Sequence, residues 1–206
     1  MNDLMIKVYL FITLIISLSV HEFSHAYAAY KQGDTTAKDQ GRMTLNPIAH
    51  FDIIGFIFLV LMAFSKFPFA YGKPVPVNPS NYRNMKNGDI LVSLWGPLSN
   101  ICLAVISAIF FRLVQHSATD SLLYFLLIMV QVNISLAIFN LIPLYPLDGS
   151  HILINLLPWK TARAYQEFMQ RYFIYVFIGL IILINTPLGH IFSAAILNIT
   201  KLLLGF

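Results

Sequence analysis

The stretch LMIKVYLFITLIISLSVHEFSHAYAAY, residues 4–30, decides the fold class of this chain. It is mostly apolar as far as Val20 and then places His21, Glu22 and His25 within five residues. A helix that crosses a bilayer needs about 20 apolar residues, and ionisable side chains at that depth are costly and mark functional sites. The stretch therefore predicts a membrane helix that ends in a chemically active segment.

The composition extends this prediction to the whole chain. Of 206 residues, 58% are hydrophobic and only 11% are charged, whereas a soluble domain is about half apolar and about a quarter charged. Further apolar runs occupy residues 90–111, 122–144 and 172–184. We expect an all-α polytopic membrane protein, a helix bundle of about five to six membrane segments.

The length leaves room for a single domain, residues 1–206, with a catalytic core at about 4–150 and C-terminal membrane helices at about 171–206. The first apolar run exceeds the roughly 7–15 residues of a signal-peptide core and precedes no small-x-small cleavage site, so we expect a retained helix. The net charge of +4 comes from Lys and Arg residues in the loops, which favours a lipid bilayer and argues against a nucleic-acid partner.

The region between the first two long apolar runs carries turn signals and one short apolar run. Gly33-Asp34 and Gly41 mark turns, and residues 42–45 have the composition of a short strand, so a small β-hairpin is predicted. Residues 53–64 are apolar but too few to cross a bilayer comfortably. This run is therefore predicted to be a re-entrant or interfacial segment after the first helix.

The pattern H-E-x-x-H at residues 21–25 places two histidines on one face of a helix. His21 and His25 can then bind one zinc ion, and Glu22 can act as general base. A catalytic zinc takes three protein ligands and keeps one position for water. Asp148 is the preferred third ligand, because it follows a membrane segment in a tract broken by prolines and glycine.

Less specific interpretations remain beside these assignments. Asp148 precedes Gly149, and Asp-Gly is a common turn pair with no metal role. His50 and His151 are the fallback ligands, although both lie near loop boundaries where interfacial histidines are common.

For the ligands to meet, the helices at 4–30 and 121–142 must end on the same side of the membrane. A large group of cations would then face that side, namely Lys31, Lys38, Arg42, Lys66, Lys73, Arg83, Lys86, Lys160, Arg163 and Arg171. The opposite side would keep Lys7 and Arg112. Positive charge favours the cytoplasm, so we expect a multi-pass protein of the cell membrane with its active site toward the cytoplasm and its N-terminus outside.

Three motifs in this order resemble the site-2 protease family of intramembrane zinc metalloproteases. They are HEFSH at 21–25, GPLSN at 96–100 and NLIPLYPLDG at 140–149. The resemblance implies one Zn²⁺ per chain bound by His21, His25 and Asp148, with Glu22 as base. It also implies a transmembrane protein or peptide as substrate. Neither a PDZ nor a CBS domain fits the loops, so the chain resembles the short, core-only bacterial type.

The same resemblance implies that Asn100 and Asn140 stabilise an unwound substrate segment. Hydrogen bonding between helices is an equally good explanation for these two amides. Two other functions compete with proteolysis. A metal-ion transporter would need polar residues along several helices, and the outer halves of the helices predicted at about 4–30 and 90–113 offer almost none. A non-proteolytic membrane binder would not need Glu22.

Overall fold

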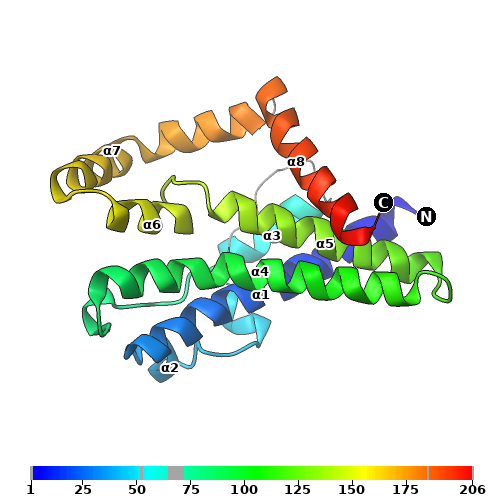
Figure 1. The fold of residues 1–206 in the computed structure, drawn as a ribbon, viewed down its shortest axis with the longest axis horizontal. Helices are drawn as coiled ribbons and strands as arrows, with labels where there is room; N and C mark the ends of the chain where they lie inside the picture. Colours follow the sequence, from blue (N-terminus) through cyan, green and yellow to red (C-terminus); the bar gives the residue numbers. More distant parts are fainter. Residues whose placement is uncertain (1, 52, 65–71, 185, 206) are drawn as a thin grey trace.

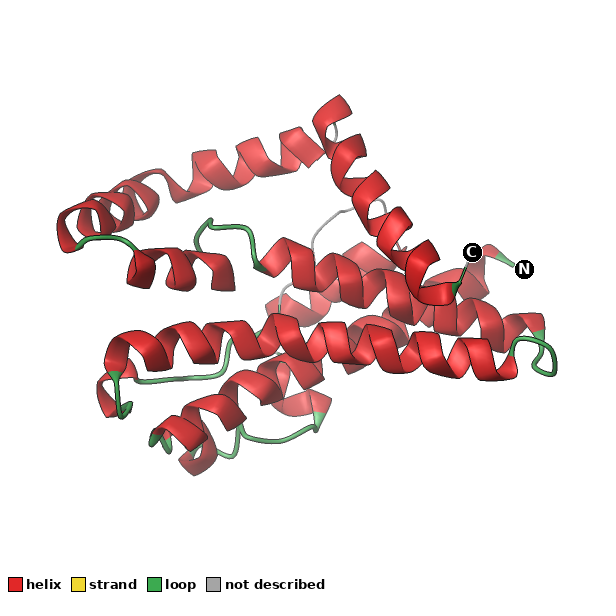
Figure 2. Cartoon of the chain, viewed as in Figure 1, coloured by secondary structure: helices red, strands yellow, loops and turns green. Residues whose placement is uncertain are grey.

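The computed structural model of the chain describes residues 2–51, 53–64, 72–184 and 186–205, and these residues fold into helices (Figures 1 and 2). The longest helices are α1, α4, α5 and α7, spanning Asp3–Gln32, Met85–Val114, Asp120–Asn140 and Trp159–Ile184. The shorter ones are α2 (Thr36–Asp39), η1 (Pro47–His50), α3 (Ile53–Phe64), η2 (Pro79–Asn81), α6 (Asp148–Leu156) and α8 (Pro187–Leu204). The predicted all-α class is confirmed for this part of the chain.

Four of the described helices, α1, α4, α5 and α7, are long and apolar enough to cross a membrane. The apolar part of α8, Gly189–Leu204, is shorter, and α3 has 12 residues. At 1.5 Å per residue α3 extends only about 18 Å, against about 30 Å for a bilayer core. The described helices thus provide four membrane-capable segments, and α3 and α8 are the remaining candidates for the predicted fifth and sixth segments.

The core is a bundle in which α4 runs antiparallel to both α1 and α5 (Figure 1). Ala104 and Ala108 of α4 are almost fully buried against Val130 and Ile134 of α5. Small side chains let two membrane helices approach closely and make van der Waals contacts along their length. In lipid these contacts hold helices together, because the hydrophobic effect does not drive their association there. Leu204 at the end of α8 completes this cluster.

The segment after α1 is helical and turned, so the predicted β-hairpin is wrong. Gly33 ends α1 with a left-handed φ of 109°. The Asp34 carboxylate then accepts hydrogen bonds from the backbone N–H and the hydroxyl of Thr36, which starts α2. Arg42 N returns to Ala37 O at 2.8 Å. Residues after Arg42 are therefore held against α2 and enter no strand within the described ranges.

The chain on either side of α3 comes back to one place. Lys73 N donates to His50 O at 2.9 Å, although α3 lies between them in the sequence. The Phe56 and Phe64 rings both contact Phe11 of α1, at centroid distances of 6.2 and 6.1 Å. These contacts agree with the re-entrant or interfacial placement of α3, which stays a prediction.

Candidate metal centre

The HEFSH motif lies in the second half of α1 and faces the interior of the bundle. His21, Glu22 and His25 are each less than 9% exposed. The two imidazoles lie one helical turn apart, and their Nε2 atoms are 3.0 Å from each other. Gly96 of α4 lies directly against them, and an added Cβ at that position would overlap both rings. Glycine at 96 is therefore required for α4 to approach the motif.

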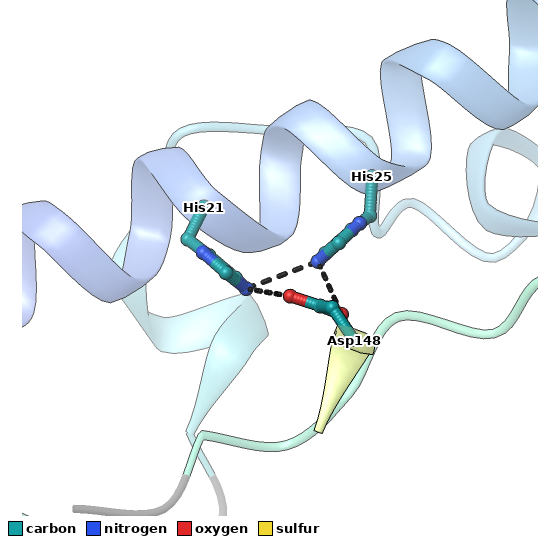
Figure 3. Close-up of side chains that lie close together, drawn as sticks. All are labelled: His21, His25 and Asp148. Atoms are coloured by element: carbon teal, nitrogen blue, oxygen red, sulfur yellow. Dashed lines mark hydrogen bonds and ion pairs between the residues drawn. The ribbon is translucent and has the colours of Figure 1, made fainter. Parts of the chain in front are cut away.

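Asp148 is brought to the two histidines as the first residue of α6 (Figure 3). Its Oδ1 lies 3.2 Å from His25 Nε2, and its Oδ2 lies 3.3 Å from His21 Nε2. The next residue, Gly149, explains how α6 fits there. A Cβ at 149 would overlap the carbonyl oxygens of Leu141 and Ile142, so only glycine lets α6 begin against the end of α5.

Hydrogen bonds to the far side of each imidazole fix its tautomer. His21 Nδ1 lies 2.7 Å from Asn100 Oδ1, and His25 Nδ1 lies 2.8 Å from Val92 O. Both partners are oxygen acceptors, so each Nδ1 carries the hydrogen and donates it. In the neutral rings each Nε2 then keeps a lone pair directed at the other Nε2 and at Asp148. This arrangement is typical of metal-binding histidines.

The donor set fits a zinc ion. His21, His25 and Asp148 are the one group of His, Cys, Asp and Glu side chains among the described residues whose ligand atoms converge for a metal. Asp148 Oδ2 is buried and has no hydrogen-bond donor, although it lies 3.3 Å from His21 Nε2. Ligand atoms about 2.0 Å from a tetrahedral ion lie about 3.3 Å apart, close to the separations of 3.0–3.3 Å found here.

Asp148 lies between the two imidazoles, with its carboxylate oxygens 3.2 and 3.3 Å from their Nε2 atoms. The site therefore offers a carboxylate and two imidazole nitrogens, which is a ligand set that suits a catalytic zinc with an open position.

Asn100 belongs to a buried amide chain that reaches back from the metal centre. Its Nδ2 donates to Asn133 Oδ1 at 2.9 Å and to Ser17 O at 3.3 Å, which leaves Oδ1 for His21. Both asparagines are 0% exposed. Sequence reasoning missed Asn133, although an amide side chain within the apolar run 122–144 is an available signal.

The other polar candidates lie outside the group of converging ligands. Asn140 Nδ2 donates to Leu136 O within its own helix, and its role toward substrate stays a prediction. His151 Nδ1 lies 3.6 Å from Asp89 Oδ2, and this contact raises the pKa of His151. His50 is buried and donates from Nε2 to Thr44 O at 2.7 Å. Neither fallback ligand joins His21 and His25.

Comparison with known proteins decides the family. The family model described as "Peptidase family M50" matches residues 9–184, which include the three converging side chains. The chain belongs to peptidase family M50. This is the site-2 protease family, so the resemblance found in the sequence is confirmed.

Two bacterial relatives of this M50 protease agree with the assignment. YwhC of Bacillus subtilis (strain 168), named as a candidate zinc metalloprotease, is 43% identical over 199 residues, covering 92% of this chain and 86% of YwhC. Rip2 of Mycolicibacterium smegmatis carries the same kind of name and is 26% identical over 173 residues, covering 84% of this chain and 65% of Rip2. No solved structure matches the chain.

These findings make the protein a zinc metalloprotease, a hydrolase that acts on peptide bonds. The four membrane-capable helices found among its described residues, together with the family, indicate a multi-pass membrane protein. The zinc implied by the family agrees with the convergence of His21, His25 and Asp148. The competing interpretations as a metal-ion transporter or a non-proteolytic binder lose their basis.

Proposed function

We propose that this M50 protease is an intramembrane endopeptidase that hydrolyses peptide bonds in or near the transmembrane segments of its substrates. One observation carries the proposal: membrane-capable helices themselves build the site. His21 and His25 come from α1, and Gly96 and Asn100 come from α4, all of them buried. A peptide bond must therefore enter the helix bundle to reach the ligands, which favours a transmembrane protein or peptide already in the lipid bilayer.

Each candidate residue has a chemical role in this proposal. His21, His25 and Asp148 hold one zinc ion, which when bound polarises a carbonyl group and promotes ionisation of water. Glu22 takes the proton of the attacking water on its carboxylate and delivers it to the nitrogen of the leaving amine. The carbonyl oxygens of a helical substrate are occupied by internal hydrogen bonds, so the cleaved segment must first unwind locally.

The distribution of charge supports a cytoplasmic active site. The end of the bundle that holds α2 and the start of α4 (Figure 1) also holds the end of α1, and these elements and the chain between them carry Lys31, Lys38, Arg42, Lys73, Arg83 and Lys86. Lys66 of the predicted set lies outside the described residues. Lys7 lies in the first part of α1, and Arg112 and Lys201 lie in the last turns of α4 and α8, at the opposite end of the bundle, where the N-terminus is located (Figure 1). By the positive-inside rule the N-terminus faces outward.

Reconstitution in vesicles tests the proposal. The purified protein is mixed with a transmembrane peptide in lipid vesicles, and the products are identified by mass spectrometry. Wild type should cut in or near the membrane segment. Glu22→Gln should keep zinc near one ion per chain and lose cleavage, because zinc rests on His21, His25 and Asp148 and not on Glu22.

Two outcomes would contradict it. Cleavage confined to soluble peptides, with the membrane peptide left intact, would place the substrate outside the bilayer. Substantial residual cleavage by Glu22→Gln would remove Glu22 from the role of base.

A further inference from the structure

An extended segment, residues 72–77, lies against the side chain of Glu22; we call it the strap. Its Val75 is 7% exposed, and the backbone N–H of Val75 donates to Glu22 Oε2 at 2.8 Å. Among the hydrogen bonds of the described residues, this is the one that reaches the Glu22 carboxylate. A backbone amide that donates to a buried carboxylate forms a charge-assisted hydrogen bond, one of the stronger kinds.

The sequence directly around Val75 leaves one amide for this contact. Pro74 and Pro76 flank Val75, and proline has no backbone N–H. The preceding amide, Lys73 N, is already used in the hydrogen bond to His50 O. Proline also holds its own φ near −65° and biases the residue before it toward extended conformations. The Pro-Val-Pro sequence therefore presents a single donor from a stiff, extended backbone.

The strap is fixed on both sides of this donor. On the N-terminal side, Arg42 Nη2 donates to Lys73 O at 2.8 Å and to Pro74 O at 3.3 Å. On the C-terminal side, Asn78 N donates to the buried Asp34 carboxylate at 2.7 Å. The Val75 side chain packs between these tethers with Ala26 of α1 and Ala37 of α2. The amide is therefore held in place by contacts that do not involve Glu22.

We infer that Val75 is a positioning residue: its backbone N–H holds Oε2 of Glu22 so that Oε1 is aimed at the attacking water. On the side of Oε1 the strap contributes Gly72, which has no side chain and whose added Cβ would lie 3.9 Å from that oxygen, at ordinary contact distance. Without the N–H, the glutamate side chain would sample other rotamers. This inference rests on the proposed role of Glu22 as base and adds the group that orients it.

The same contact has an opposite functional interpretation, in which the strap blocks Glu22 and must lift before catalysis. The two interpretations predict effects of opposite sign. Removing the N–H lowers the turnover rate if the strap positions Glu22, and raises it if the strap inhibits Glu22.

Val75→Pro tests the inference, because it removes the N–H while keeping an extended backbone. We expect kcat to fall about 10- to 100-fold, as is usual when a catalytic group is misplaced, with KM within about 3-fold and zinc still near one ion per chain. Val75→Ala is the matched control: it loses the side-chain contacts but keeps the N–H, and kcat should stay within about 3-fold of wild type.

A second variant removes the N–H with less structural change. Replacing Val75 by its α-hydroxy acid converts one amide to an ester with the same side chain, and it should reproduce the kcat loss of Val75→Pro. An isotope-edited infrared spectrum of the Glu22 carboxylate should shift in this variant and not in Val75→Ala.

Equal kcat losses in Val75→Ala and the ester variant, or a rise in kcat in the ester variant, would overturn the inference. A membrane peptide and a soluble peptide of the same sequence are assayed in parallel. On whichever peptide is cut, the ratio of the variant's kcat to that of wild type tests the role of Val75. Which of the two peptides the wild-type enzyme cuts tests the proposed function.

Discussion

At the scale of single residues, Asn100 connects the metal centre to the bundle interior. It accepts from His21 Nδ1 at 2.7 Å, and Asn133 fixes its amide from the other side. Partners behind metal-binding histidines set the tautomer and the ring orientation, and losing one costs about 10- to 100-fold in metal affinity. We therefore expect Asn100→Ala to weaken zinc binding by that factor, measured by competition with a chelator.

Asn140→Ala is the control for this prediction, since its amide donates to its own helix at Leu136 O. It should leave zinc affinity within about 2-fold of wild type, because no described contact joins it to the imidazoles. Asn133→Ala should have an intermediate effect, because Asn100 would keep its bond to Ser17 O. Equal zinc affinity in Asn100→Ala and Asn140→Ala would show that Asn100 does not orient His21.

Asp148 is expected to be the third zinc ligand. Asp148→Ala should lower both zinc content and activity, because two imidazoles alone leave the ion without its third protein ligand. His151→Ala and His50→Ala should keep zinc, since their nitrogens contact Asp89 and Thr44 instead. Metal content of the purified variants in detergent decides the matter. Full zinc in Asp148→Ala with loss in either histidine variant would reassign the ligand.

The sequence allowed the converging side chains of the candidate metal centre to be predicted, but not the groups that contact them from behind. His21, Glu22 and His25 are separated by fixed helical geometry, so their spacing alone indicates the chemistry. Asn133 and Val75 act across long sequence distances, and only the packing of α5 and of the strap against α1 brings them to the site. The Val75 contact also uses a backbone atom, which side-chain patterns cannot reveal.

At the scale of helices and loops, the length of the apolar runs predicted the membrane helices well. The structure of the polar segments was predicted poorly. The predicted helices at 4–30 and 121–142 correspond closely to α1 and α5, and the apolar run at 90–111 lies within α4. The helix expected from residue 172 begins at Trp159, because the polar residues 160–171 continue it with Ala162 and Met169 buried. The predicted hairpin failed because the Asp34 side chain bonds directly to Thr36 and starts a helical turn.

The buried carboxylate of Asp34 accepts several hydrogen bonds from the loop next to the strap. It predicts that the stability of the fold decreases in acid. It is 1% exposed and accepts from Thr36, Asn78 and Asn81. Burial alone would raise the pKa of Asp34, but these hydrogen bonds lower it below 3.8. Since the folded-state pKa is lower than the unfolded one, the carboxylate stabilises the fold above the unfolded pKa, and this contribution is lost as pH falls through the folded pKa.

Asp34→Asn should therefore lower the thermal midpoint at pH 6, and its difference from wild type should shrink as the pH falls below about 4. Thermal unfolding in detergent from pH 6 to pH 3 gives the comparison. Asp39→Asn is the control, because Asp39 is exposed and accepts one side-chain hydrogen bond, from Thr35. A difference between Asp34→Asn and wild type that stays constant over this range would exclude the ionised carboxylate as the cause.

At the scale of the whole molecule, the outer surface of the bundle matches a lipid environment. Large apolar side chains on the membrane-capable helices are strongly exposed, among them Ile106, Leu113, Ile174 and Ile182 at 60% or more. Such exposure is favourable in hydrocarbon and unfavourable in water. Most of the buried polar side chains belong to α1, α4 and α5, among them Ser17, His25, Asn100 and Asn133. The bundle is therefore apolar outside and polar around the candidate metal centre.

This arrangement also predicts on which side each loop lies. The connection between α4 and α5 lies at the same end as the N-terminus, whereas α2 and the start of α4 lie at the other end (Figure 1). The chain between α1 and α4 must therefore begin and end on one side. The hydrogen bond from Lys73 N to His50 O brings the two flanks of α3 together, so α3 should enter the membrane region and return without crossing it.

Cysteine labelling tests this topology directly. Cys102 is the one cysteine of the chain, so Cys102→Ser provides a clean background for Lys38→Cys, Lys73→Cys and Ser117→Cys, all at exposed positions. An impermeant thiol reagent should label positions 38 and 73 only from the cytoplasmic side, and position 117 only from outside. Labelling of 38 and 73 from opposite sides would mean that α3 crosses the bilayer. In that case the strap, which contains position 73, would lie on the opposite side of the membrane from α2, which contains position 38. The hydrogen bonds from Arg42 to Lys73 O and from Asn78 N to Asp34 do not permit this, because Arg42 and Asp34 both lie beside α2.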